Sequence, residues 1–433
     1  MFQTIRNAWK MSDLRAKILF TLFILLLYRV GAVIPVPFMN PDVVGSLGQS
    51  SAGILDYLNI LSGGAFAQAT LFALGISPYI TSSIVIQLLT VAIPALERLS
   101  QQGEDGKKKL NQITRYVTVI LALITSIGYY FMLKTGMGTG ASWLTDNGWF
   151  AAIIIIACYC AGSSLVMWLA EKVNENGIGN GISLILFINI VSRGPAMLGS
   201  LIDGMKSGVA GIIIGICAAV FGLFLICLIV FVNDSERRIP VQYAKKVVGR
   251  KMYGGQNSTL PIKLNNTGVM PIIFASSIVS LPATIAMFFD YEKSKFWKAF
   301  VGLFDAGSWL YAVLTLVLIV AFAYFYILIS FNPVEVSNNL KKNGGSIPGI
   351  RPGKPTSDYI KKVLNRITLI GAIFLGFIAV FPMIVNMFLP ASMNLNELVF
   401  GGSSIIIVVG VIIETAREIE GQMTMRHYKG FLE

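Results

Sequence analysis

The sequence predicts an all-α polytopic membrane protein, and three observations lead to this fold class. The chain has 433 residues, of which 55% are hydrophobic and only 13% charged, so it has too little polar surface for a soluble protein of its length. Its apolar segments continue without interruption for roughly 20 residues, the length that a membrane-spanning helix needs. They lack the alternation of β-barrel strands, so helices are expected to satisfy the backbone hydrogen bonds.

Ten transmembrane spans are predicted from these apolar segments. The fifth is the weakest, because its apolar run is short, but removing it would reverse the orientation of every later span. The ten segments are 18–37, 70–95, 114–133, 149–170, 181–193, 208–232, 268–289, 309–331, 367–388 and 398–415.

The distribution of Lys and Arg supports ten spans with both termini in the cytoplasm. In this arrangement 27 of the 34 Lys and Arg residues lie on the inner side, six lie outside, and Arg29 lies in the first span. Such an excess of positive charge is typical of cytoplasmic segments. Without the fifth span, the most basic loops would move to the outside. The formal net charge of +12 also suits contact with anionic lipids, acidic proteins or RNA.

The two ends of the chain, residues 1–17 and 418–433, are therefore expected in the cytoplasm. In the first of them Phe2, Ile5 and Trp9 share one helical face beside Arg6 and Lys10. This pattern is typical of an amphipathic helix that lies at the membrane surface.

Residues 54–68 form an apolar segment that is too short to cross a membrane. The segment lies on the outer side, passes through Gly63 and Gly64, and leads directly into the second span. Backbone of this kind is tolerated at membrane depth only where protein or a cavity surrounds it. We therefore interpret it as a short re-entrant helix, with an amphipathic helix on the outer leaflet as the alternative.

Prolines occur inside the second and seventh predicted spans, at Pro78, Pro271 and Pro282. Because proline lacks a backbone N–H, kinks are expected at these positions.

The ten spans divide into two halves, 18–207 and 208–417, with five spans in each. An odd number of spans gives the two halves opposite orientations, as in an inverted repeat with a substrate path between the halves. No internal sequence repeat is visible, so this interpretation depends on the number of spans alone.

Groups for ion coupling or bond chemistry are scarce. Apart from Arg115 and Arg193 at span ends, the spans contain the charged residues Arg29 and, near an end, Glu414, and neither has an evident partner in its own segment. The Gly-rich residues 177–181 lack the preceding strand and following Lys-Ser/Thr of a phosphate-binding loop, so a turn is expected. Four cysteines in apolar spans have no metal-ligand spacing and are expected to be buried packing residues. The sequence thus predicts no enzyme, cofactor or metal.

Two long loops, 233–266 and 332–365, carry seven and six Lys or Arg residues. Orientation in the membrane needs only a few charges near a helix end. Loops of more than thirty residues more often bind a partner, and basic residues beside aromatic ones suit RNA phosphates or an acidic protein surface. We interpret both loops as a docking platform.

Six short segments of the chain form a set of motifs that is highly specific when taken together. They are 72–80 (FALGISPYI), 177–183 (GIGNGIS), 240–246 (PVQYAKK), 274–277 (FASS), 339–342 (NLKK) and 347–353 (IPGIRPG). These motifs resemble the SecY family, the channel subunits of the bacterial Sec protein translocase, and the resemblance extends in order from about residue 18 to 417.

The resemblance implies a clamshell of two halves around an hourglass-shaped pore. It implies a ring of apolar side chains at the waist of the pore, a plug on the outer side, a lateral gate between spans two and seven, and cytoplasmic docking of a motor or ribosome. Family members often have isoleucine at the position of Leu186, a mild departure. The implied residues are Ile76, Ile80, Leu186, Ile273 and Ile407 for the ring; Leu55, Tyr57, Leu58, Ile60, Leu61, Gly63 and Gly64 for the plug; Thr81 and Thr125 for polar contacts at the gate; and Arg250, Lys251, Lys341, Lys342 and Arg351 for docking.

The function implied by the resemblance is passive conduction of unfolded polypeptide. Preproteins with a signal sequence would cross the bacterial plasma membrane, and membrane-protein segments would leave sideways into lipid. The implied partners are the small membrane subunits SecE and SecG, the ATPase SecA and the ribosome. A secondary transporter for a small apolar or zwitterionic solute is the alternative from another class, and a membrane-embedded transferase lacks candidate residues.

Overall fold

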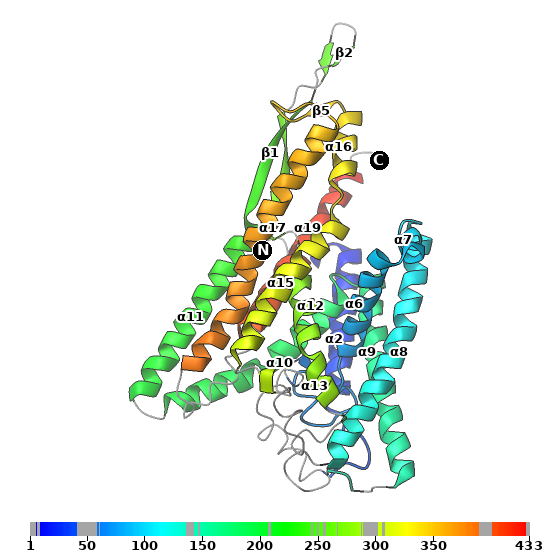
Figure 1. Ribbon diagram of the computed structural model, residues 1–433, viewed down its shortest axis with the longest axis vertical. Helices are drawn as coiled ribbons and strands as arrows, with labels where there is room; N and C mark the ends of the chain where they lie inside the picture. Colours follow the sequence, from blue (N-terminus) through cyan, green and yellow to red (C-terminus); the bar gives the residue numbers. More distant parts are fainter. Residues whose placement is uncertain are drawn as a thin grey trace.

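The computed structural model is a bundle of long helices from which a β-hairpin projects at one end (Figure 1). Five of its helices are long and apolar enough to cross a membrane, or six if the pair α6 and α7, bent by 106°, is one span; only the described residues are counted. The structure describes residues 6, 9–40, 59, 61–135, 143–145, 148–206, 209–243, 246–248, 251–253, 257–265, 267–286, 288, 302–304, 308–388 and 401–429.

Each of the ten predicted segments contains a helix, although the number of helices that cross a membrane stays a prediction. The fifth segment, the weakest by sequence, continues as a helix to Met205. The helices are α2 (Ser12–Gly31), α6 (Ser77–Ala92) with α7 (Pro94–Ser100), α8 (Glu104–Thr135), α9 (Trp149–Asn176), α10 (Gly181–Met205), α11 (Val209–Asp234), α12 (Met270–Val279) with α13 (Leu281–Ala286), α15 (Trp309–Ser330), α17 (Lys354–Phe388) and α19 (Gly401–Lys429).

The prediction of kinks at Pro78 and Pro271 was wrong, because both residues lie in the first turn of a helix, α6 and α12 respectively. Proline is well suited to this position, since the first backbone N–H groups of a helix have no partner in the helix. Pro282 differs: it is the second residue of α13, directly after the break that ends α12. The helix of the second span consequently starts at Ser77 rather than near residue 70, and residues 62–76 form turns.

The two basic loops fold together, which the all-α prediction did not include. Strand β1 (Glu236–Tyr243) pairs antiparallel with β4 (Asn257–Lys263), and β2 (Lys246–Val248) pairs with β3 (Lys251–Tyr253) towards the tip of the hairpin. The second loop contributes helix α16 (Pro333–Lys342) and strand β5 (Gly345–Ser346), which pairs with β1 on the side opposite β4. The predicted loop 332–365 thus ends at Gly353, where α17 begins.

A small apolar core fixes this hairpin to the helices below it. Ile239 of β1 and Ile262 of β4 pack with Ile360 of α17 and with Ile327 of α15. All four side chains are at most 4% exposed. The strand pattern explains the contact, because alternate residues of β1 point to one face of the sheet.

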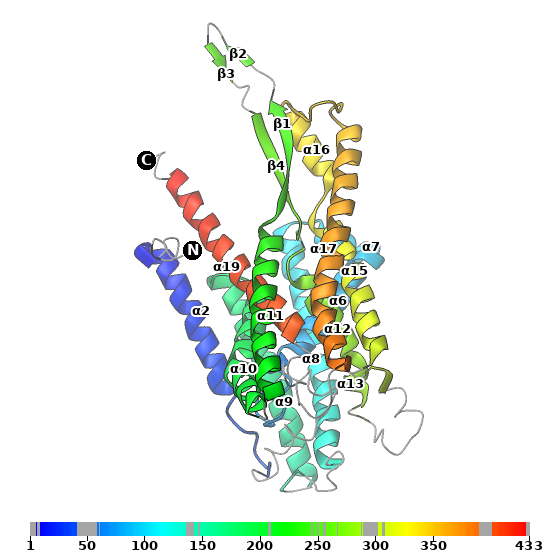
Figure 2. The same cartoon turned by 90° about the vertical axis from the view of Figure 1, so that its left-hand side faces the viewer.

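Helix contacts between described residues join the two halves of the chain. Helix α10 packs against α11 and α19, α6 packs against α12, and α8 contacts α13. The start of α2 and the end of α19 lie towards the end of the molecule from which the hairpin projects (Figure 2), the same side on which the sequence predicts both termini. The inverted relation of the two halves stays a prediction.

Several expectations for single residues changed. Cys158 and Cys160 are half-buried, and Cys217 and Cys227 are exposed on the helix surface, so the expectation of buried cysteines was wrong. The predicted C-terminal tail continues helix α19 as far as Lys429. Most of the predicted N-terminal amphipathic helix lies outside the described residues, although Trp9 within it is helical and 46% exposed.

Candidate functional site

The five residues expected at the pore waist come together in one apolar cluster. They are contributed by α6, α10, α12 and α19, which include helices from both halves of the chain. Ile76 and Ile80 are one turn apart at the start of α6, since the Ile80 N–H donates to the Ile76 carbonyl at 3.1 Å. Every one of the five side chains is almost fully buried, with exposed fractions of 2% for Ile76, 2% for Ile80, 0% for Leu186, 3% for Ile273 and 3% for Ile407.

This waist is closed and apolar. A dry constriction of aliphatic side chains resists ions because water does not fill it, and it makes no fixed hydrogen bonds that a passing chain would have to match. The structure therefore places the five residues where a seal between the halves is possible. Their role as a pore ring stays a prediction.

The described part of the re-entrant segment is buried inside the protein. Asn59, Leu61 and Ser62 are 4%, 7% and 2% exposed, which contradicts an outer-leaflet surface helix for these residues. Gly63 and Gly64 have positive φ angles of 66° and 91°, and residues 62–69 form turns instead of the expected helix. Leu55, Tyr57, Leu58 and Ile60 lie outside the described residues.

Side-chain hydrogen bonds hold this segment in its turns. The Asn59 Oδ1 atom accepts a hydrogen bond from the Ala67 N–H at 3.1 Å, and the Ser62 hydroxyl accepts one from the Phe66 N–H at 2.9 Å. From the neighbouring helices, the Tyr129 hydroxyl of α8 donates to the Phe66 carbonyl at 2.6 Å. The Tyr159 hydroxyl of α9 donates to the Ala69 carbonyl at 3.2 Å. Buried backbone without regular structure is thus satisfied by side chains.

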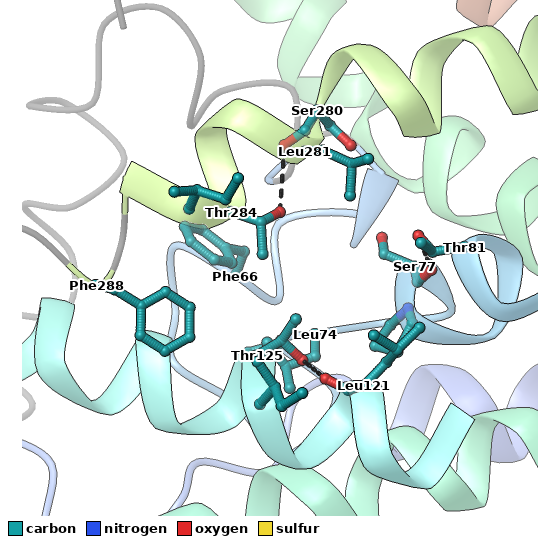
Figure 3. Close-up of a pocket in the computed structure, with 14 residues that line it drawn as sticks. Phe66, Leu74, Ser77, Thr81, Leu121, Thr125, Ser280, Leu281, Thr284 and Phe288 are labelled. Carbon is teal, nitrogen blue, oxygen red and sulfur yellow. Dashed lines mark hydrogen bonds between the residues drawn. The ribbon is translucent and has the colours of Figure 1, made fainter. Parts of the chain in front are cut away.

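A pocket of about 240 Å³ lies between α6, α8 and α13, and both residues expected at the lateral gate line it (Figure 3). Phe66 of the buried segment lines the same pocket, so the residues expected at the gate and the buried segment border one cavity. The lining residues are Phe66, Ala73, Leu74, Ser77, Pro78, Thr81, Leu121, Ile124, Thr125, Ser280, Leu281, Thr284, Ile285 and Phe288.

The threonine hydroxyls in this pocket do not bond across it. Thr81 donates to the Ser77 carbonyl at 3.1 Å, and Thr125 donates to the Leu121 carbonyl at 2.8 Å, each within its own helix. Polar contacts between the walls, the expected role of Thr81 and Thr125, are therefore not formed in this structure. The hydroxyls are satisfied locally, so the pocket offers a mainly apolar surface.

A polar seam that sequence reasoning missed joins α6 to α8. The Ser82 hydroxyl donates to the Thr114 carbonyl at 3.0 Å, and the Thr118 hydroxyl donates to Ser82 Oγ at 2.9 Å. Ser82 and Thr118 are fully buried. The hydroxyl residues at 82, 114 and 118 were visible in the sequence, but their pairing depends on how the two helices pack.

The docking residues that the structure describes lie at the hairpin end of the molecule. Lys341 and Lys342 at the end of α16, and Arg351 in the turn before α17, are exposed. The Thr356 hydroxyl donates to the Arg351 carbonyl at 2.9 Å and fixes the backbone of this turn. Lys251 is in β3, near the hairpin tip. Arg250 lies outside the described residues.

The platform is these two folded loops, 233–266 and 332–365, joined by the pairing of β1 with β5. An ionic contact fixes the base of the platform to α19. The Arg417 guanidinium donates to the Asn233 carbonyl at 2.8 Å and to Asp234 Oδ1 at 2.7 Å. Burial, as the larger cause, and the nearby Arg417 charge lower the pKa of the Lys263 amine.

A second contact of α19 involves Glu418, the residue after Arg417. Its carboxylate accepts a hydrogen bond at 2.9 Å from the Gly179 N–H in the turn before α10. This turn, predicted from residues 177–181, is confirmed.

Comparison with known proteins gives a consistent result over the whole length. The family model described as SecY matches residues 70–416. The Streptomyces galbus protein named protein translocase subunit SecY is 43% identical, over 100% of both chains. A solved structure from work on the plug domain of SecY has a TM-score of 0.67 at 17% identity, covering 94% of this chain and 92% of that one. Sec61 in a canine ribosome–channel complex from the endoplasmic reticulum has a TM-score of 0.60 at 17% identity and the same coverage.

Proposed function

Because the chain belongs to the SecY family, we propose that it is the protein-conducting channel of a bacterial protein translocase. It moves unfolded preproteins across the plasma membrane and releases membrane-protein segments sideways into lipid. The observation that carries this proposal is the position of a buried apolar waist, built from both halves, in a molecule whose basic platform projects from one end. The channel is not an enzyme, and the energy for movement comes from a separate motor.

The apolar waist explains how one pore accepts many sequences. An unfolded polypeptide presents charged, polar and apolar side chains in turn, so a ring that made fixed hydrogen bonds would hold some of them and reject others. Aliphatic side chains move aside by rotamer changes and make no directional bonds. When no chain is present they close again and exclude water, which keeps ions from following.

The pocket between α6, α8 and α13 supports a lateral gate at this place. A signal sequence contains an apolar region of about 7–15 residues, and the pocket offers this region apolar side chains together with threonines whose hydroxyls are already satisfied. Separation of α6 from α12 would open a path from the waist to this pocket and to lipid. The buried segment with Gly63 and Gly64, proposed to be the plug, borders the same pocket through Phe66.

The basic platform is proposed to bind SecA during translocation and a ribosome during synthesis of membrane proteins. Its exposed charges include Lys341, Lys342 and Arg351 on one loop and Arg237 and Arg238 on the other. Charges of one sign on a projecting surface speed up association with an acidic or nucleic-acid partner. The ribosome complex of the structural neighbour Sec61 supports the second partner. SecE and SecG are proposed as the small membrane subunits, and anionic lipids as the surrounding headgroups.

The experiment that tests this function measures SecA-driven translocation of a preprotein into vesicles that contain the chain and its small subunits. Arg351→Glu is expected to lower the rate by about tenfold, because charge reversal at an interface replaces attraction by repulsion. Lys361→Glu is the matched control, because this exposed lysine lies close to Arg351 in the sequence, in the first part of α17, and is not assigned to docking. Wild-type rates in Arg351→Glu would contradict the docking role, and a wild-type chain that moves no preprotein would contradict the function itself.

A further inference from the structure

Arg29 in the first predicted span is not explained by passive conduction. An ionisable side chain at membrane depth is costly and most often has a functional reason. Helix α2 places Arg29 against the buried segment that follows Asn59, and its Nη1 atom is buried without a hydrogen-bond partner among the described residues. The neighbouring Tyr28 ring stacks on Phe72, in the turns that follow this segment, at 5.5 Å between centroids. This face of α2 therefore contacts the segment and does not turn its arginine to lipid.

A second polar side chain reaches the same place from α10. Asn189 is completely buried in an otherwise apolar stretch of this helix. Its Nδ2 atom donates to the Leu61 carbonyl at 2.7 Å. Its Oδ1 atom is buried and has no hydrogen-bond partner in the part of the chain that the structure describes.

Gly63 lies between these two polar groups. A Cβ atom at this position would lie 2.9 Å from Asn189 Oδ1 and 3.1 Å from Arg29 Nη1. Its φ angle of 66° is also one that side chains rarely adopt. Two independent features therefore require glycine here. The unpaired acceptor atom, Asn189 Oδ1, and the unpaired donor atom, Arg29 Nη1, both lie next to this glycine.

We propose that Asn189 acts as a latch: its hydrogen bond to the Leu61 carbonyl holds the plug segment closed against α10. The absence of a side chain at Gly63 leaves the space that this contact needs. The inference rests on the proposed function. The latch acts on a backbone carbonyl, so it holds the position of the segment without requiring a particular side chain there.

The buried polar atoms without a hydrogen-bond partner explain why such a latch can be released. A buried polar atom without a partner raises the free energy of the closed state, because the same atom is hydrogen-bonded when water reaches it. When the segment leaves, water reaches Asn189 Oδ1 and Arg29 Nη1 and both become solvated. The Asn189 hydrogen bond thus stabilises the closed state together with the hydrogen bonds from Tyr129 and Tyr159. Buried polar atoms without a partner among the described residues, which include Asn189 Oδ1, Arg29 Nη1 and the Tyr28 hydroxyl, weaken it, and this keeps the two states close in free energy.

The test measures resting ion conductance of the complete channel complex in planar bilayers. Asn189→Leu keeps the size of the side chain and removes its donor, and it is expected to raise resting conductance several-fold. Ser192→Ala is the control, because Ser192 is one turn away on α10 and bonds only to the Asn189 carbonyl of its own helix. Its conductance is expected to equal that of the wild type.

A deletion variant distinguishes the loss of the Asn189 hydrogen bond from a general defect of α10. In a channel lacking residues 57–65, Asn189→Leu is expected to cause no further increase, since the group that it holds is absent. An unchanged conductance in Asn189→Leu, or an increase of the same size in the deletion background, would overturn the proposal.

A labelling measurement covers the case in which Asn189→Leu folds poorly. In Leu61→Cys, the side chain at this 7% exposed position is expected to be protected from a membrane-impermeant maleimide added from outside. Adding Gly63→Ala, which forces a methyl group between Asn189 and Arg29, is expected to make Cys labelling several-fold faster. Equal labelling with and without Gly63→Ala would also overturn the proposal. Preprotein translocation by the wild type is measured in parallel, so failure of the latch and failure of the channel function give different results.

Discussion

The waist and the platform of this molecule are built from opposite chemistry. At the waist, side chains from four helices are at most 3% exposed and all five are aliphatic. The platform consists of strands, turns and the short helix α16, and its exposed basic residues include Arg237, Arg238, Lys341, Lys342 and Arg351. The difference follows from what each region meets. A pore for any polypeptide must avoid fixed hydrogen bonds, as proposed for the waist, whereas a docking surface, as proposed for the platform, needs charges in fixed positions.

Helix α19 belongs to both regions. Ile407 near its start lies in the waist cluster, and Arg417 in its middle part holds the base of the hairpin. Glu418 holds the turn that precedes α10, the helix that carries Leu186. A displacement of the platform therefore has a continuous path of packed and bonded groups to the waist, with Arg417 as the contact at which the two regions are joined.

The largest effect is expected from making the waist polar. Ile273→Asn places an amide in the apolar cluster, so water is stabilised in the constriction and resting ion conductance should increase by about tenfold or more. Planar-bilayer recordings measure the change, and Ile273→Val serves as the control that keeps the waist apolar. Equal conductance of Ile273→Asn and the wild type would show that this residue does not face the constriction.

A smaller effect is expected from loosening the platform while the waist stays intact. Ile360→Ala removes a fully buried side chain from the cluster that joins β1 and β4 to α17, with an expected local loss of about 2–4 kcal/mol. Hydrogen exchange of the β1 amides should become faster and SecA-driven translocation slower, with resting conductance unchanged. Lys361→Ala, at the next and exposed position, is the control. If conductance also rose in Ile360→Ala, the two regions would not be separable in this way.

The smallest effect is expected at the contact that joins the regions. Arg417→Gln removes an ionic hydrogen bond to Asp234, whose side chain is 64% exposed, so the loss is only about 1 kcal/mol. SecA-driven translocation should fall by less than in Ile360→Ala. Because salt screens exposed charges, the gap between variant and wild type should narrow as salt concentration rises. A gap that salt does not change would assign Arg417 a role other than this ion pair.

The helices of this fold could be predicted from the sequence to a large extent, because each apolar run contains the signal for its own helix. All ten predicted segments contain one. The start of α6 was misplaced because residues 70–76 are as apolar as the helix that follows, and only Pro78 marks the first turn. In this case the proline indicated a helix start that apolar character alone could not locate.

The platform could not be predicted in the same way, since its structure depends on contacts between distant residues. Strand β5 has two residues, and it pairs with a strand that begins at Glu236. No local pattern in Gly345 and Ser346 indicates this pairing. A weaker signal was available in β1, where buried Ile239 and Val241 alternate with exposed residues.

The polar contacts inside the bundle were also outside the reach of sequence reasoning. Asn189 is a single amide within an apolar run, and this isolation is a signal that could have marked it as a candidate. The sequence does not show that Leu61 is its partner, because the two residues are 128 positions apart. Such contacts follow from the packing of helices and not from local pattern.

The central claim is that polypeptide passes through the waist, and site-specific crosslinking tests it most directly. A photoreactive side chain replaces Leu186, and a preprotein is arrested midway during SecA-driven translocation. Val220 on α11, which is 61% exposed on the helix surface, carries the same probe as the control. The account predicts strong crosslinks to the arrested chain from position 186 and none from position 220. Crosslinks from position 220 alone, or equal crosslinks from both, would contradict a path through the apolar waist.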